Sequence, residues 1–218
     1  MTKDMKTGND AAAEGNPFET AFPHAMQGSS AQDKKTDRRV RRTRILLQQS
    51  LIRLMAEKEI KDITVKELSE SADITRGTFY LHYSDIYDIL RNMEYELFVE
   101  FNDILNRSLD ADGKTPAPEA TLTDIFSFLE RHRDTVKVMM GPHGDIAFIN
   151  RLKDLVKERI YHNLAQKQTD YEYDYAEAFA VSGCIGVVET WLLHPAPLPP
   201  EKMAKICCDM LMQGLDLT

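Results

Sequence analysis

The 218-residue sequence has only three cysteines and no long apolar run. No stretch reaches the ~18 apolar residues of a membrane-spanning helix, and the N-terminal residues lack the apolar core of a secretory signal. Cys184, Cys207 and Cys208 are odd in number, and two of them are adjacent. This pattern argues against a disulfide framework and is typical of the reducing cytoplasm. We therefore expect a cytoplasmic protein with no membrane partner.

Motifs for catalysis and metal binding are also lacking. The sequence contains no H-x-x-E-H or C-x-x-C pattern, so no metal site is predicted. No nucleophile–base set and no phosphate-binding loop is visible, which argues against an enzyme and against a bound cofactor. Alternating strand patterns and internal repeats are missing as well. Helical spacing is present almost throughout, and it predicts an all-α fold.

The charge is unevenly distributed along the chain. The net charge of the whole chain is −8, but residues 34–83 carry +5, residues 84–218 carry −10 and residues 1–33 carry −3. A basic segment on an acidic body indicates a localised anion-binding face. The alternative is an ordinary solvated run of charges.

The N-terminal third of the sequence combines a polar tail with four predicted helices. Residues 1–33 are rich in Ala, Gly, Asn, Ser and Pro and are predicted to be disordered. A first amphipathic helix starts at Arg38. Thr64 and Glu67 form a T-x-x-E capping box for a second helix, and Thr75 is the expected N-cap of a short third helix. Two helices joined by about three residues predict a helix-turn-helix. Ser84 is the expected cap of a longer fourth helix.

The remainder of the chain is predicted to be a second helical region. The segment "DADGKTPAPEA" has the composition of a linker. After it, further helices are expected at Thr121–His132, Asp145–Gln166, Tyr171–Leu193 and Glu201–Leu215. The predicted organisation is a tail at 1–33, a three-helix helix-turn-helix domain at 34–84 and a helical ligand-binding and dimerisation domain at 85–218.

The third helix lies in the stretch "ITRGTFYLHY" and has two kinds of side chain. Ile74 and Phe79 are spaced to face inward, whereas Arg76, Tyr80 and Leu81 face outward. A DNA-recognition helix needs this division, because arginine can reach guanine and a leucine can contact a thymine methyl. The alternative is a small helix packed in a larger bundle, with solvated polar residues.

Residues 38–90 resemble the DNA-binding domain of the tetracycline-repressor (TetR) family of bacterial transcription regulators. The resemblance rests on the basic start "RRVRRTR" and on "ITVKELSESADITRGTFYLHYSDIYDIL". It implies a dimer that binds double-stranded operator DNA, with a variable helical domain for an unknown small-molecule effector. The DNA-binding residues that it and the charge pattern indicate are Arg41, Arg42, Arg44, Thr64, Lys66, Thr75, Arg76, Thr78, Tyr80, Leu81, His82 and Tyr83. His82 and Tyr83 would contact or support the DNA backbone.

One position departs from the family pattern. Where the family usually has a phosphate-binding lysine at the start of the fourth helix, this sequence has Ile86. If this position faces the DNA, one phosphate anchor is missing, and the arginines of 38–44 could compensate. In the alternative, Ile86 packs inward and seats the fourth helix.

The C-terminal half suggests a dimer interface and a ligand pocket. The interface is expected at a small-residue stripe and a facing apolar stripe, namely Ala176, Ala180, Gly183 and Val187 with Met203, Ile206 and Met210. Two such helices per subunit would form a four-helix bundle, although packing within one chain is the alternative. The candidate pocket residues are Phe126, Met139, Met140, Phe148, Tyr161, Phe179 and Trp191. Each of these could equally be an ordinary core residue.

These observations predict a dimeric, ligand-responsive transcription regulator that acts as a repressor. The rival interpretation is a helical adaptor or co-regulator that keeps the fold without binding DNA. The basic segment and the outward Arg76 favour the regulator.

Overall fold

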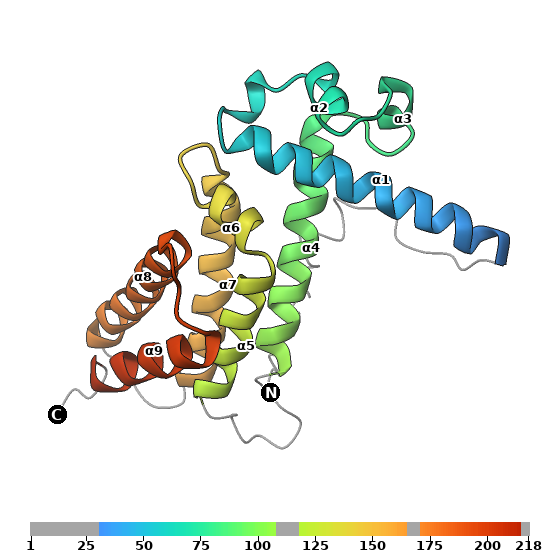
Figure 1. Ribbon diagram of the computed structural model, residues 1–218. Helices are drawn as coiled ribbons and strands as arrows, with labels where there is room; N and C mark the ends of the chain where they lie inside the picture. The colour runs from blue at the N-terminus through green and yellow to red at the C-terminus, as the bar shows by residue number, and fades with distance from the viewer. Residues whose placement is uncertain (1–30, 108–117, 165–170, 215–218) are drawn as a thin grey trace, which may run out of the picture. The chain divides into compact units, whose positions relative to one another are not determined.

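The computed structural model describes residues 31–107, 118–164 and 171–214, and within these ranges it contains nine α-helices, one 3-10 helix and no strand (Figure 1). The all-α prediction is confirmed. The chain divides into two compact units, residues 1–38 and residues 39–218. All contacts below lie in the second unit. None of the described helices has the length and apolar character that a membrane span requires.

The first four helices follow the predicted order. They are α1 (Ala31–Met55), α2 (Val65–Ser71), α3 (Arg76–Tyr80) and α4 (Ile86–Arg107), with the 3-10 helix Ile60–Asp62 between α1 and α2. Helix α1 starts earlier than the predicted Arg38, so residues 31–33 belong to a helix and not to the tail. The rest of the predicted tail lies outside the described residues.

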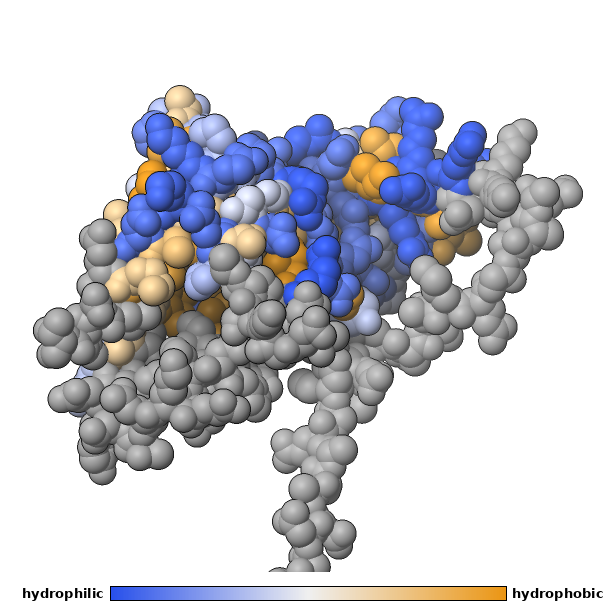
Figure 2. All heavy atoms as spheres, turned by 90° about the horizontal axis from the view of Figure 1, so that it is seen from below, coloured by the Kyte–Doolittle hydropathy of each residue, from blue (hydrophilic) through white to orange (hydrophobic). Residues whose placement is uncertain are grey.

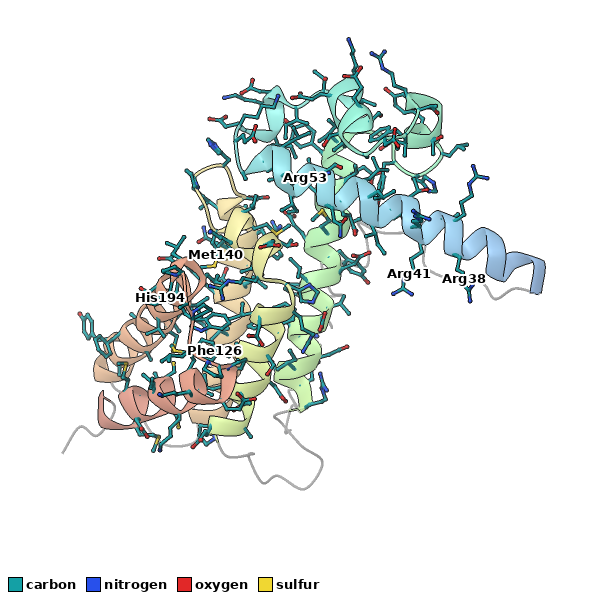
Figure 3. All side chains as sticks on the ribbon, in the orientation of Figure 1. Arg38, Arg41, Arg53, Phe126, Met140 and His194 are labelled. Carbon is teal, nitrogen blue, oxygen red and sulfur yellow. The ribbon has the colours of Figure 1, made fainter. Side chains whose placement is uncertain are left out.

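Helix α1 is attached to the helix-turn-helix by apolar and polar contacts. Leu47 and Leu51 are fully buried, and Met55 is 1% exposed. Arg53 donates to Ser50 Oγ at 2.9 Å and to the carbonyl of Ser71 at 3.3 Å, which joins α1 to the last residue of α2 (Figure 3). The last carbonyls of a helix have no partner within it, so this arginine satisfies one of them.

Side-chain caps set the starts of these short helices. Thr64 Oγ1 accepts the Glu67 N–H at 3.2 Å, and Thr75 Oγ1 accepts the Thr78 N–H at 3.1 Å. Both predicted caps are confirmed. Such caps are worth ~1 kcal/mol each.

The predicted cap of α4 is wrong by one residue. Asp85 Oδ1 accepts the Asp88 N–H at 2.7 Å, while Ser84 donates its own N–H to Asp88 Oδ2 at 2.9 Å. Asp85 therefore caps the helix. Its carboxylate also suits the positive end of the helix dipole better than a hydroxyl does.

Five helices form the C-terminal half: α5 (Pro118–Arg131), α6 (Arg133–Met139), α7 (Ile146–Leu164), α8 (Tyr171–Leu193) and α9 (Pro200–Gly214). The predicted helices correspond to α5, α7, α8 and α9, and α8 has the predicted bounds. Helix α6 was not predicted, because seven residues are too few for a clear helical period. Helix α9 packs against both α5 and α8 (Figure 1).

A tryptophan and an arginine fix the end of α8. The Trp191 ring is 3% exposed and meets Phe126 edge-on at 5.4 Å, and its Nε1 donates to the Leu198 carbonyl at 2.8 Å. Arg133 lies 5.0 Å from the centre of that ring. Its Nη2 donates to the carbonyls of Trp191 and Leu192 at 2.9 and 2.7 Å. A charged donor at the negative end of a helix is stabilising. The end of α8 is thus bound to the start of α6.

A buried glutamate and a partly exposed arginine join α4 to α7. Glu94 is 5% exposed, and its Oε2 accepts from Arg151 Nη2 at 3.0 Å. Burial and the nearby negative Asp145 raise the pKa of Glu94 to about 7, and they outweigh the opposing effect of Arg151. Removal from water disfavours the charged carboxylate more than this one arginine favours it.

Candidate nucleic-acid interface

The turn between α2 and α3 is built by the backbone. The Asp73 N–H bonds to the Glu70 carbonyl at 3.2 Å, and the Ile74 N–H bonds to the Ser69 carbonyl at 3.0 Å. These two bonds form a Schellman motif, whose left-handed residue is usually glycine. Here that residue is Asp73, with φ of 54°. Aspartate tolerates this conformation better than most residues do, and the chain therefore reverses sharply into α3.

One side of α3 is fixed in the core. Phe79 is fully buried, and its ring contacts the neighbouring Tyr80 edge-on at 5.1 Å. The Tyr83 ring lies 6.4 Å from the Phe79 ring. Ile74 is partly buried against the same core. A five-residue helix has little stability alone, so this packing holds α3 in place.

The other side of α3 is open. Arg76 and Gly77 are exposed, Tyr80 is 60% exposed and Leu81 is 81% exposed. The predicted division between inward and outward residues is therefore present. Few large apolar residues have a side chain as exposed as that of Leu81. The arrangement leaves an arginine, a phenol and an apolar tip available to a partner.

The threonines at the start of α3 bond to each other. Thr75 is exposed, yet its Oγ1 accepts the Thr78 N–H and also lies 2.9 Å from Thr78 Oγ1. Thr78 is partly buried. The hydroxyls of both threonines are therefore engaged in the capping arrangement at the start of α3.

His82 and Tyr83 differ in their environment. Tyr83 is only 5% exposed, and burial raises the pKa of its hydroxyl to about 12. The predicted contact with, or support of, the DNA backbone by Tyr83 thus falls on a side chain that is almost fully buried. His82 is partly exposed, and burial together with the charge of Arg44 lowers its pKa. The positive charge of Arg44 on α1 therefore acts on His82, the second residue after α3.

The other candidate DNA-binding residues are all exposed, but they do not point the same way. Arg41, Arg42 and Arg44 are exposed on α1, and so are Thr64 and Lys66. Lys66 Nζ lies 3.9 Å from Glu70 Oε1. Figure 3 shows Arg41 extending from α1 on the side away from α2 and α3. Of these three arginines, Arg44 is the one whose charge lowers the pKa of His82, just after α3.

A large open cleft lies where α1 meets α4 and α6. Its volume is about 980 Å³. Its apolar lining includes Ile52, Met93 and Leu97. At one side Glu100 accepts from Arg131 Nη2 at 2.5 Å and lies 2.8 Å from His132 Nε2. Cationic and anionic groups thus surround an apolar floor.

The predicted pocket residues do not line this cleft. Phe126, Met139, Phe148 and Trp191 are at most 3% exposed and belong to the core. Met140 is partly buried, and the side chain of Tyr161 lies outside the described residues. Phe179 is 67% exposed on α8.

A second, smaller groove runs between α8 and α9. Its volume is about 320 Å³, and its lining is almost entirely apolar. The lining residues are Phe179, Ala180, Gly183, Cys184, Val187, Cys207, Met210 and Leu211. Four of the residues predicted for the dimer interface are among them. Figure 2 views the molecule from below and shows hydrophobic residues in separate patches, one of them on the side where α8 and α9 lie.

The remaining predicted interface residues lie around this groove. Ala176 and Ile206 are partly buried, and Met203 is 8% exposed. Met210 is 58% exposed, and a Cβ added to Gly183 would meet no atom within 4 Å. The predicted stripe therefore combines residues packed within the chain with residues open to a partner.

Comparison with known proteins gives the family. Residues 117–213 match the TetR_C_8 family, described as a transcriptional regulator C-terminal region. The chain is 25% identical over 177 residues to YxbF, an uncharacterized HTH-type transcriptional regulator of Bacillus subtilis (strain 168), with 77% of this chain and 44% of the relative covered. Its C-terminal region, residues 117–213, thus belongs to a TetR family of transcriptional regulators.

Solved structures of TetR regulators share the fold. A regulator from Streptococcus agalactiae 2603V matches with a TM-score of 0.55 at 22% identity, over 82% of this chain and 98% of that chain. FadR of Bacillus subtilis, solved in complex with stearoyl-CoA, matches with a TM-score of 0.56 at 14% identity, over 78% and 98% of the two chains. The chain spans less than half the length of the curated relatives it matches, 44% and 39%.

Ile86 distinguishes this chain from the TetR sequence pattern. Its side chain is only 5% exposed and belongs to the same core as Ile89 and Leu90. The inward alternative for this position is therefore correct. A lysine here could not reach a phosphate without leaving the core.

Sequence reasoning missed two features of this TetR fold. Asp73 carried no signal, because the residue normally found at a left-handed helix end is glycine. The cleft combines α1 with α4 and α6, which are far apart in the sequence. Among the described residues no group of three His, Cys, Asp or Glu side chains could hold a metal ion.

Proposed function

We propose that this protein is a cytoplasmic, dimeric, ligand-responsive repressor that binds operator DNA through α3. The observation that carries the proposal is the helix α3 itself. Its inner side is anchored by Phe79, which is fully buried, while Arg76, Tyr80 and Leu81 are exposed. A recognition helix must be held rigidly and must still offer its side chains to base edges. The protein acts by binding and needs no catalytic group or cofactor.

The exposed residues of α3 have distinct roles in the proposal. Arg76 reads guanine in the major groove, because its guanidinium can donate to O6 and N7 together. Leu81 contacts a thymine methyl, and Tyr80 and Thr78 contact the groove walls. The exposed Gly77 lets the backbone of α3 come close to the DNA.

Phosphate contacts come from the flanking elements. Thr64 and Lys66 lie at the start of α2, and His82 follows α3. Arg44, with Arg42 on the same helix, supplies positive charge from α1. Phosphate contacts position the protein and carry no sequence information. Because Ile86 is buried, this set has to act without the lysine that the family usually has.

Two chains pair through the faces of α8 and α9 in this proposal. The groove between these helices is apolar and open, with Phe179 and Met210 exposed at its sides. A partner chain that covers it would remove these side chains from water, which is favourable at ~25 cal/mol per Å². A two-fold axis at this face would give a four-helix bundle. To enter successive major grooves, the two α3 helices of such a dimer must lie about 34–36 Å apart.

The proposed effector site is the cleft between α1, α4 and α6. Its volume of about 980 Å³ is at the upper end of the range for small-molecule sites. A ligand there would contact α1, which supports α3, and α4, which leads into the C-terminal half. The ligand changes the affinity of the protein for DNA only if it binds one arrangement of these helices more tightly than the other. This site can be tested by screening metabolites for a rise in melting temperature. A metabolite that binds in the cleft should lose this effect in a Leu97→Trp variant, whose larger side chain fills the cleft.

The test of DNA recognition compares two arginines in a gel-shift assay on the DNA upstream of the gene. Arg76→Ala should weaken binding by ~1–3 kcal/mol, which is about 5- to 150-fold, and should relax the preference at one base pair in each half-site. Arg107→Ala is the matched control, since Arg107 is exposed at the far end of α4. If the wild type and both variants bind the DNA with equal affinity, Arg76 does not read a base.

The dimer has its own test. A Cβ at Gly183 meets no atom within 4 Å, so Gly183→Leu fits the single chain. Light scattering should then show a loss of dimer, while the melting curve still shows a folded helical chain. A dimer that is intact in this variant would place the interface elsewhere.

A further inference from the structure

Two cysteines that are far apart in the sequence meet between α8 and α9. Cys184 Sγ and Cys207 Sγ are 3.7 Å apart, although the two residues are 23 positions apart along the chain. Cys184 is partly buried and Cys207 is 3% exposed, and both line the open groove between the two helices. A small solute in the groove therefore has a route to the pair.

The two thiols are chemically unequal. The two sulfurs are within hydrogen-bond distance, and either thiol can be the donor. Donation from Cys184 lowers the pKa of Cys207 against the effect of its burial. The same hydrogen bond and burial raise the pKa of Cys184. Since the thiolate is the reactive form, Cys207 is the attacking group and Cys184 is the second thiol.

The surrounding residues allow the sulfurs to come closer. A disulfide requires ~2.05 Å between the sulfurs, so the present separation of 3.7 Å must shrink by about 1.7 Å. One turn before each cysteine stands a small buried residue, Ala180 on α8 and Ala204 on α9. Gly183, beside Cys184, carries no side chain that would obstruct the approach.

We propose that Cys184 and Cys207 are an oxidant-sensitive pair that closes into a disulfide between α8 and α9 when the protein meets a hydroperoxide. The Cys207 thiolate attacks one peroxide oxygen, the O–O bond breaks, and hydroxide leaves and takes a proton to become water. The resulting sulfenic acid is then attacked by the Cys184 sulfur. The S–O bond breaks, the S–S bond forms, and the hydroxyl leaves as water with the proton of Cys184. Two thiols are oxidised by two electrons, and hydrogen peroxide is reduced to two waters.

Cys208 provides a matched control within the same chain. It is adjacent to Cys207, but successive residues of a helix point about 100° apart, so it does not face Cys184. It is partly buried, and burial together with the acidic Glu119 and Asp209 raises its pKa. It should react more slowly than Cys207 although it is a neighbour in sequence.

The test treats the full reduced chain with hydrogen peroxide, alkylates the remaining thiols and maps tryptic peptides by mass spectrometry. We expect a peptide carrying Cys184 linked to the C-terminal peptide, two hydrogens lighter, and free peptides again after dithiothreitol. The link should persist in Cys208→Ser and fall at least tenfold in Cys207→Ser. Persistence in Cys207→Ser, or a link that joins two chains on a non-reducing gel, would overturn the proposal. The outcome does not depend on DNA binding, and a partner chain that covers the groove, as in the proposed dimer, would slow the reaction by limiting access to the pair.

Discussion

Replacing Gly77 by alanine should change folding stability and DNA affinity in opposite directions. Gly77 is exposed at the second position of α3, and a Cβ there would meet only Thr75 Oγ1, at an ordinary 3.7 Å. Alanine is favoured over glycine in a helix by up to ~1 kcal/mol. For a chain of this size that is worth about 2–4 °C in melting temperature. The free protein should therefore become slightly more stable.

The same methyl group should weaken DNA binding. If the backbone of α3 lies close to the DNA at Gly77, the added methyl forces the helix outward and lengthens the contacts of Arg76 and Leu81. We expect a loss of at least tenfold in affinity, about 1.4 kcal/mol, by fluorescence anisotropy with labelled operator DNA.

Gly186→Ala is the control for this experiment. Like Gly77, Gly186 is an exposed glycine within a helix, but it lies in α8. A Cβ added to Gly186 would meet no atom within 4 Å. That variant should gain stability and keep its DNA affinity, provided that light scattering shows it is still a dimer. A Gly77→Ala protein that melts higher and binds DNA as tightly as the wild type would refute the close approach of α3.

Three further substitutions test other parts of the structure. Ile86→Lys should lower the free energy of unfolding by at least ~2 kcal/mol, because an apolar side chain that is 5% exposed is replaced by a charge; an unchanged urea midpoint would show that the position faces solvent. Asp73→Val should cost ~1–2 kcal/mol, since φ is 54° there, whereas Asp73→Gly should cost much less; equal urea midpoints for both variants would contradict the left-handed turn. Glu94 has a folded pKa of about 7, above its ordinary 4.5, so between these values the folded state holds the extra proton and wild-type stability falls as the pH rises. Relative to Glu94→Gln, the wild type should lose up to about 3 kcal/mol between pH 4.5 and 7, and parallel stability curves would show that the carboxyl is not perturbed.

Local signals in the sequence were enough for most of the helix-turn-helix. Thr64 and Thr75 cap their helices as predicted, because a cap depends on residues only three positions away. The same proximity explains why Phe79 could be assigned to the core. The turn at Asp73 could not be predicted in this way, since its two hydrogen bonds involve backbone atoms only.

Ile86 shows how a family pattern can mislead where periodicity does not. The lysine of the TetR pattern suggested a position that faces DNA. The spacing of Ile86, Ile89, Leu90 and Met93 follows one face of a helix, and all four are buried. For this residue the apolar period of the chain itself was the better guide.

Features formed by residues that are far apart in the sequence could not be predicted from it. The cleft is lined by residues of α1, α4 and α6, and the apolar periodicity of one helix does not show which other helices pack near it. The contact of Cys184 with Cys207 depends on how α8 packs on α9. The apolar residues predicted to line a ligand pocket, such as Phe126 and Phe148, are buried in the core, because pocket and core residues have the same composition.

The most direct test of the account is selection of bound sequences from a pool of random duplex DNA. A dimer that reads DNA with two α3 helices should enrich an inverted repeat whose half-site centres are 10–10.5 base pairs apart or a multiple of that. The Arg76→Ala protein should lose the preference at one position of each half-site. Recovery of no enriched sequence by the folded dimer, or of a motif that Arg76→Ala leaves intact, would contradict the claim that α3 reads DNA.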